Sequence, residues 1–181
     1  AYLSTNCSDM VAAYKSTGLV LYRGMSSREP VVKSMVRKNR KPAEMELDRH
    51  MYLNKLFLAA GITSTRSNSL FCSTSSGTAS SWGSNVYILF MKNGWHGVTF
   101  MFNTDDYSYY ELSSLALGGL HGRYDLDTAV EKLNALDPFM IKDQESLKTV
   151  LRKKVVDLIL TGTTYIGLNI DSKLTLEVLQ I

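Results

Sequence analysis

Three short stretches place charged or hydroxyl side chains beside strand-like apolar residues, and the first is Leu21-Tyr22-Arg23-Gly24. Here an arginine closes an apolar strand and a glycine follows at once. A strand-end arginine is costly unless it is paired or holds an anion, and a glycine lets a ligand approach the backbone closely. The pattern is compatible with an anion site; the plainer alternative is a solvated strand end and a turn.

The second stretch, Phe71-Cys72-Ser73-Thr74-Ser75, carries hydroxyl groups along a predicted strand. Because side chains alternate along a strand, we expect Ser73 and Ser75 on one face and Thr74 on the other. Such hydroxyls can bond a sugar or orient an arginine. The alternative is an exposed strand edge, since threonine is a good strand former.

The third stretch places Asp157 among the apolar residues 155–160, just before the turn Thr161-Gly162-Thr163. Burying a lone carboxylate is expensive, so an aspartate inside such a strand must be paired, hydrogen-bonded or functional. The alternative is a salt bridge, or a place on the exposed face of an edge strand.

The composition indicates an ordinary globular chain. Its 181 residues predict one domain over residues 1–181, with 45% hydrophobic and 20% charged residues. The formal net charge of +3 is too small by itself to argue for nucleic acid.

Several classes of protein are not indicated by the sequence. We expect no membrane span, because no apolar run reaches eighteen residues, and the first ten residues lack a signal-peptide pattern. Cys7 and Cys72 suit a reducing compartment such as the cytoplasm. We also expect no metal site, since these cysteines show no metal-ligand spacing with the histidines, which are His50, His96 and His121.

Hydrophobic periodicity and turn residues predict a mixture of helices and strands. Helices are expected at residues 8–15, 43–60, 76–82, 126–136 and 144–154, the last with Asp143 as its N-cap. Strands are expected at residues 19–23, 70–75, 86–91, 97–102, 155–160, 163–169 and 174–179. Residues 105–124, with Tyr107, Tyr109 and Tyr110, are expected to be irregular. Without strict strand–helix alternation, this mixture favours α+β with largely antiparallel sheets.

The order of the three stretches resembles the arginine–serine–glutamate class of mono-ADP-ribosyltransferases, in particular the small phage-encoded enzymes that modify host proteins. The resemblance runs from residue 21 to residue 163, and the expected closing strand at 174–179 also fits it. Residues 37–42 and 66–71 are similar to a group of uncharacterised phage proteins. The resemblance implies two packed antiparallel sheets with flanking helices around an NAD cleft.

The resemblance also implies an activity, which is the transfer of ADP-ribose from NAD, as substrate, to a host macromolecule with release of nicotinamide. It would act in the host cytoplasm, and packaging in a virion is a further implication. NAD would be bound by Tyr22, Arg23, Gly24, Ser73, Thr74 and Ser75. Arg23 would hold the pyrophosphate or ribose side, Gly24 would offer its backbone to the nicotinamide amide, and Ser73 would bond Arg23 and the catalytic acid.

The catalytic acid of the family is a glutamate, and the nearest position here is Asp157. Asp157 is one carbon shorter and one residue closer to the turn. Two positions earlier the family often has Glu or Gln, whereas this chain has Val155, so arginine is not indicated as the acceptor. Glu145 is the second choice of acid, although its segment predicts a helix start, where acids are favoured by the helix dipole.

Two other functions stay open at this point: an NAD glycohydrolase that uses water as acceptor, and a catalytically degenerate domain that binds or inhibits a partner. The basic residues 33–41 can meet an acidic partner, nucleic acid or the phosphates of NAD. If the transferase interpretation holds, Arg23, Ser73 and Asp157 must converge in one cleft, and side chains on different surfaces would end it.

Overall fold

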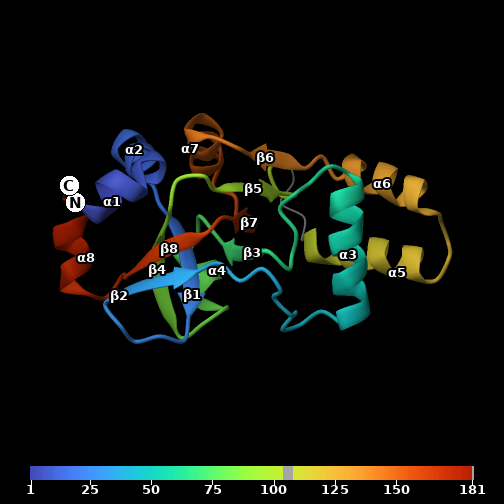
Figure 1. Cartoon of the computed structure of the whole chain (residues 1–181), viewed down its shortest axis with the longest axis horizontal. Helices are drawn as coiled ribbons and strands as arrows, with labels where there is room; N and C mark the ends of the chain where they lie inside the picture. Colours follow the sequence, from blue (N-terminus) through green and yellow to red (C-terminus); the bar gives the residue numbers. More distant parts are fainter. Residues whose placement is uncertain (104–107, 181) are drawn as a thin grey trace.

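Two four-stranded antiparallel sheets with flanking helices form the part of the chain that the computed structural model describes, residues 1–103 and 108–180 without the side chains of Ser108 and Tyr109 (Figure 1). The strands are β1 (Leu21–Met25), β2 (Val31–Met35), β3 (Ser69–Cys72), β4 (Asn85–Met91), β5 (His96–Thr99), β6 (Phe139–Ile141), β7 (Leu158–Thr161) and β8 (Thr164–Asn169). The helices are α1 (Tyr2–Asn6), α2 (Ser8–Thr17), α3 (Leu47–Ala59), α4 (Ser76–Ser80), α5 (Ser108–Leu120), α6 (Leu126–Ala135), α7 (Gln144–Lys153) and α8 (Lys173–Val178). The predicted α+β class is therefore confirmed.

The two sheets are joined through their edge strands. One sheet has the order β1-β4-β8-β2 and the other β3-β7-β5-β6. Tyr22 of β1 and Ser73, directly after β3, exchange both backbone hydrogen bonds, at 2.7 and 2.9 Å. This single bridge brings β1 against the end of β3, so Tyr22 and Ser73, which are 51 positions apart in sequence, become neighbours.

The strand β7, inside the second sheet, is buried on both faces. In β7, Leu158 and Leu160 pack into a core shared with α2 and α7, whereas Ile159 packs into a second core with α3, α5 and α6. This is the two-residue alternation of a strand, and it explains the continuous apolar run in the sequence. Figure 1 shows α3, α5 and α6 gathered at one end of the molecule, with both termini at the other end.

Several predicted elements are confirmed. The structure has helices near residues 8–15, 126–136 and 144–154, and strands near 86–91 and 163–169. Asp143 caps α7 in a capping box, in which its side chain accepts from the Ser146 N–H at 2.8 Å. The cap and the amphipathic period therefore identified α7, and the continuous apolar run identified β4.

The predicted strand at 174–179 is wrong, because this segment is the helix α8. Ser172 caps it by accepting from the Leu174 N–H at 3.3 Å. The apolar alternation that indicated a strand does not mark a buried face, since Leu174 and Leu176 are 43% and 65% exposed. The closing strand that extended the family resemblance toward the end of the chain is therefore absent from the described structure.

The expectation that residues 105–124 are irregular is also wrong, because α5 occupies most of them. Leu112, Leu115 and Ala116 are buried at helical spacing against α3 and α6. Gly118 and Gly119 lie inside the helix rather than in a turn; a Cβ on either would overlap the hydroxyl of Tyr124 or Tyr52, respectively. Of the three tyrosines in this stretch, Tyr110 is exposed, whereas Tyr107 and the side chain of Tyr109 lie outside the described residues.

The basic stretch between residues 33 and 41 is only partly a loop. β2 covers its first residues and pairs with β8 at the edge of its sheet. The chain then runs without regular structure to α3, which starts at Leu47 rather than at residue 43. The short strands and helices β2, β6 and α1 were not predicted, since each is too short to show a period.

Two further findings concern membranes and metals. No helix within residues 1–103 and 108–180 is long and apolar enough to cross a membrane. In the same residues, no three His, Cys, Asp or Glu side chains are grouped as metal ligands. Cys7 and Cys72 are both buried and free.

Gly24 generates a prediction about stability. A Cβ on Gly24 would overlap the carbonyl oxygen of Ala79, at the end of α4, and β1 also packs directly against the backbone of Gly83. We expect Gly24→Ala to lower the free energy of unfolding by about 1–3 kcal/mol, because backbone atoms must move. Gly77→Ala, in α4, is the matched control: its Cβ would meet only the Ser75 Oγ at 3.6 Å, so stability should stay unchanged or rise. Chemical denaturation measures both, and a fully stable Gly24→Ala variant would contradict this packing.

Candidate active site

A pocket of about 550 Å³ lies where the two sheets meet. This volume is in the range of small-molecule and cofactor sites. The pocket is lined by apolar residues, among them Phe71 of β3, Val98 of β5 and Ile159 of β7, together with many polar and charged ones. Its charged and aromatic lining residues are Arg23, Arg40, Lys41, Glu44, His50, Phe57, Arg66, Phe71, Trp82, Phe100 and Asp157.

Strand register explains why the pocket forms on this face. Phe71 of β3 and Val98 of β5 both pair with Ile159 of β7, so the three side chains share one face of the sheet. Asp157 precedes Ile159 by two residues and lines the same pocket. The segment before α3, with Glu44 and the buried Met45, forms another wall.

Asp157 lies just before β7 and not inside a strand, so the predicted strand at 155–160 is wrong in its first half. α7 continues to Lys153, and Lys154 has a left-handed backbone (φ 62°) that ends the helix. The strand then begins at Leu158. Because Asp157 precedes the buried strand, it is half-buried and its side chain still reaches solvent.

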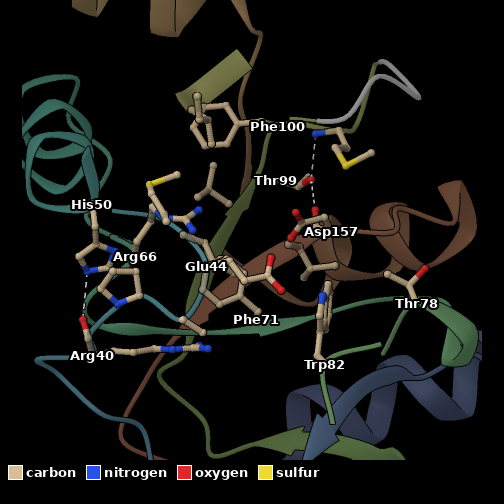
Figure 2. A pocket seen from close by; sticks show the side chains of 18 of the residues that line it. Arg40, Glu44, His50, Arg66, Phe71, Thr78, Trp82, Thr99, Phe100 and Asp157 are labelled. Atoms are coloured by element: carbon tan, nitrogen blue, oxygen red, sulfur yellow. Dashed lines mark hydrogen bonds between the residues drawn. The ribbon is translucent and has the colours of Figure 1, made fainter. Parts of the chain in front are cut away.

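Two threonines fix the backbone around this acid. Thr74 donates to the carbonyl oxygen of Val155 through both its N–H, at 3.0 Å, and its hydroxyl, at 2.6 Å. The Thr99 hydroxyl donates to the carbonyl oxygen of Asp157 at 2.7 Å. Figure 2 shows Thr99 beside Asp157, whose carboxylate stays free of this bond. Thr99 was not identified from the sequence, because its partner is 58 residues away.

The Asp157 carboxyl has an unusual pKa. Burial raises the pKa to about 6 from its ordinary value near 3.8, and the positive charge of Arg66 acts in the opposite direction. The group is therefore mainly ionised at pH 7 but titrates close to neutrality. A carboxylate of this kind in a pocket is typical of a functional acid, although structural ion pairs also shift pKa values.

Arginines gather around Phe71. The Arg23 Nη1 donates to the carbonyl oxygen of Phe71 at 2.8 Å. The guanidinium groups of Arg40 and Arg66 lie over the Phe71 ring, 4.7 and 5.0 Å from its centroid. Burial, together with the charges of Arg23, Arg66 and Arg37, lowers the pKa of Arg40 to about 10.

His50 holds the backbone of the basic segment. Its Nε2 lies 3.0 Å from the carbonyl oxygen of Arg40 and 3.0 Å from the Ser67 hydroxyl. Because a carbonyl only accepts, Nε2 carries the proton. Burial, followed by the charge of Arg66, lowers the pKa of His50, so the ring is neutral at pH 7. This residue therefore links Arg40 to α3 rather than acting as an acid or base.

The structure brings some of the predicted site residues into the pocket and not others. Arg23, Gly24 and Asp157 line it. Ser73 does not, because it is fully buried behind the bridge to β1, where its hydroxyl accepts from the Ser75 N–H at 2.9 Å. Ser73 is adjacent to the pocket only indirectly, because its partner Tyr22 precedes the lining residue Arg23 in β1.

Tyr22, Thr74 and Ser75 also lie outside the pocket lining formed by the described residues. Tyr22 forms the bridge to Ser73, and Thr74 holds Val155. The predicted strand at 70–75 ends at Cys72, because Ser75 accepts from the Thr78 N–H at 3.2 Å and caps α4. The expected alternation of hydroxyls on two faces therefore does not occur.

The second acid considered from the sequence, Glu145, lies away from the pocket. It is exposed in the first turn of α7 and forms a 3.0 Å ion pair with Lys148. The carboxylate that shares the pocket with Asp157 is instead that of Glu44. Figure 2 shows the Glu44 side chain directed into the pocket between Arg66 and Trp82. Nothing in the sequence near Glu44 marked it as a site residue.

Other lining residues were only indirectly visible in the sequence. Arg40 belongs to residues 37–42, and Arg66 and Phe71 bound residues 66–71, the two stretches that are similar to phage proteins. Their meeting around one ring could not be foreseen, because it depends on how the irregular chain after β2 folds back over β3.

The raised pKa of Asp157 predicts a pH-dependent stability change. In the unfolded chain this carboxyl titrates near 3.9, so its ionisation opposes folding progressively from about pH 4 to pH 6 and fully above that. Asp157→Asn should therefore raise the free energy of unfolding by about 1–3 kcal/mol at pH 7.5 and by nothing at pH 4. Urea denaturation at the two pH values measures this; an equal effect at both would mean that the carboxylate is not desolvated.

No protein-family model, no curated protein and no solved structure matches this chain. What the chain does must therefore be inferred from the pocket itself. The pocket combines a desolvated acid, a cluster of arginines and the β1 residue Gly24.

Proposed function

We propose that this chain has the ADP-ribosyltransferase-type fold and is an NAD-dependent mono-ADP-ribosyltransferase. The observation that carries the proposal is that Arg23, in β1 of one sheet, and Asp157, directly before β7 of the other, line one pocket of dinucleotide size although 134 positions separate them in sequence. Cationic groups for a diphosphate and a desolvated carboxylate for a developing positive charge then lie in the same pocket.

The reaction needs little from the protein beyond position and charge. The bond between the ribose C1′ and the nicotinamide nitrogen breaks, and its electron pair leaves with nicotinamide. Positive charge develops on C1′ and the ring oxygen, where the Asp157 carboxylate stabilises it. The acceptor then forms a bond to C1′ with its own lone pair and releases its proton to solvent or to a nearby base.

The backbone of Gly24 supports the position of nicotinamide. Tyr22 turns its N–H and C=O toward Ser73 and away from β4. Because these groups alternate along an antiparallel strand, Gly24 turns its own N–H and C=O to the same side as Tyr22. This strand backbone faces the pocket end that Gly24 lines, where it can bond the carboxamide of nicotinamide.

The family resemblance supplies the rest of the proposal. The acceptor is a macromolecule of a phage-infected host, modified in the cytoplasm, with packaging in the virion as a second route. An NAD glycohydrolase would use the same pocket with water as acceptor. A degenerate binding or inhibitor protein would keep the pocket without turnover, and the shorter side chain of Asp157 is the feature that favours this alternative.

The acid provides the first test of the activity. Asp157→Asn should retain NAD binding, because the amide is nearly isosteric, but should lose nearly all turnover of NAD. Removing one preorganised group of this kind costs on the order of a hundredfold or more. Release of nicotinamide, followed by chromatography, and NAD binding by calorimetry measure the two effects.

Three variants complete that experiment. Asp157→Glu restores the residue of the family and should raise turnover if the shorter side chain limits it. Glu145→Gln is the control, since this exposed acid is paired with Lys148 outside the pocket. Glu44→Gln tests the other pocket carboxylate: a full loss there with normal turnover in Asp157→Asn would move the catalytic role to Glu44. A wild-type chain with neither transfer nor hydrolysis would leave the binding protein as the function.

The pKa of Asp157 also sets a pH dependence. Only the ionised carboxylate can stabilise the positive charge, so kcat/KM should be constant above about pH 7 and fall about tenfold per pH unit well below pH 6. A pH profile of nicotinamide release measures the midpoint. Activity that persists unchanged at pH 5 would show that this carboxylate is not the group required.

A further inference from the structure

We infer that Arg40, rather than Arg23, is the arginine that binds the diphosphate of a nucleotide in this pocket, with Arg66 beside it on the Phe71 ring. The inference rests on the proposed function for the nature of the nucleotide. Its physical basis, however, is the charge and geometry of the arginine cluster, which holds for any diphosphate. It reassigns to the basic segment after β2 a role that the family resemblance gives to Arg23.

Arg23 is already engaged by the protein. Its Nη1 donates to the carbonyl oxygen of Phe71 at 2.8 Å, which ties β1 to β3 beside the sheet junction. Its guanidinium carbon lies 6.0 Å from the Tyr165 ring centroid, and its Nε is buried without a protein partner. Arg23 therefore holds β3, the strand that carries Phe71.

Arg40 is placed differently. Its guanidinium carbon lies over the Phe71 ring, 4.7 Å from the ring centroid. No salt bridge among the described residues includes Arg40, and its Nη1 is buried without a protein partner. The backbone carbonyl of Arg40 is held by His50, so the segment is positioned before any ligand binds.

The electrostatics of the cluster favour the binding of an anion. The charges that act on Arg40 come from Arg23, Arg66 and Arg37, and together with burial they lower its pKa to about 10. Lys41 adds a further cation to the lining. Positive charge concentrated in a partly closed pocket raises the local concentration of anions, and planar guanidinium groups match phosphate oxygens in a bidentate way.

A diphosphate fits this arrangement better than a single anion, because two guanidinium groups share the Phe71 ring, Arg40 at 4.7 Å and Arg66 at 5.0 Å. Arg66 also acts electrostatically on Asp157. Figure 2 shows Arg40 and Arg66 on one side of the pocket and Asp157 on the other. A diphosphate bound at the arginines would therefore present its attached ribose toward Asp157.

The test uses calorimetric titration of the full chain with ADP, adenosine and inorganic pyrophosphate. We expect wild type to bind ADP more tightly than either adenosine or pyrophosphate. Arg40→Gln should weaken ADP roughly ten- to hundredfold, as expected for the loss of charge-assisted hydrogen bonds, and leave adenosine unchanged. Because adenosine affinity is measured on the same sample, it also verifies that the variant is folded.

Two matched variants separate a specific contact from diffuse charge. Arg37→Gln removes one charge from the same segment, outside the pocket lining, and should change ADP affinity by no more than about twofold. Arg23→Gln should lower thermal stability but keep the preference for ADP over adenosine. Phe71→Leu should weaken ADP binding, and it should have little additional effect in an Arg40→Gln background if the ring acts through Arg40.

Four results would overturn the inference. These are unchanged ADP affinity in Arg40→Gln, an equal loss in Arg37→Gln, a collapse of the ADP preference in Arg23→Gln alone, and wild-type ADP binding no tighter than that of pyrophosphate. Failure of the proposed function gives a different pattern, in which ADP binds through Arg40 but no nicotinamide is released from NAD.

Discussion

The pair of backbone hydrogen bonds between Tyr22 and Ser73 is the constraint on which the pocket depends. It fastens the edge of one sheet to the edge of the other. From this junction Arg23 reaches the carbonyl oxygen of Phe71, and Gly24 is pressed against the end of α4 so closely that no side chain fits. Ser73 therefore has a structural role. Its main chain forms the junction with Tyr22, and its hydroxyl accepts from the Ser75 N–H in the turn before α4.

The same junction concentrates groups that oppose folding. Arginines that repel one another surround Phe71, and Asp157 is charged at a desolvated position. Each of these features lowers the stability of the empty protein, and each is relieved by a ligand that carries negative charge to the arginines and positive charge to the acid. Such local conflicts with stability are concentrated at functional sites. A dinucleotide with a diphosphate and a reacting ribose has this distribution of charge.

The sequence predicted the parts of the fold that have a strong period or a clear cap. The α7 helix was identified from Asp143 and its amphipathic face, and β4 from its apolar run. The segment of α8 was predicted as a strand because its leucines alternate, and the N-cap Ser172 was not recognised. In the pocket, Arg23 and Asp157 were found because each is anomalous within its own strand-like stretch. Glu44 and Thr99 were not, since their roles arise from contacts between distant segments, and Arg40 was included only as one of the basic residues 33–41.

The position of Val155 shows how far this chain departs from the family it resembles. Val155 is buried, 3% exposed, in the core opposite the pocket, and its carbonyl is held by Thr74. The Val155 side chain therefore packs in the core and is not among the described residues that line the pocket. The main chain of Asp157 is similarly held through its own carbonyl. In the proposed reaction, a held acid suits a charge that always forms at the same ribose carbon. Contact with the acceptor in that reaction comes from another segment, and Glu44 is the other carboxylate among the described lining residues.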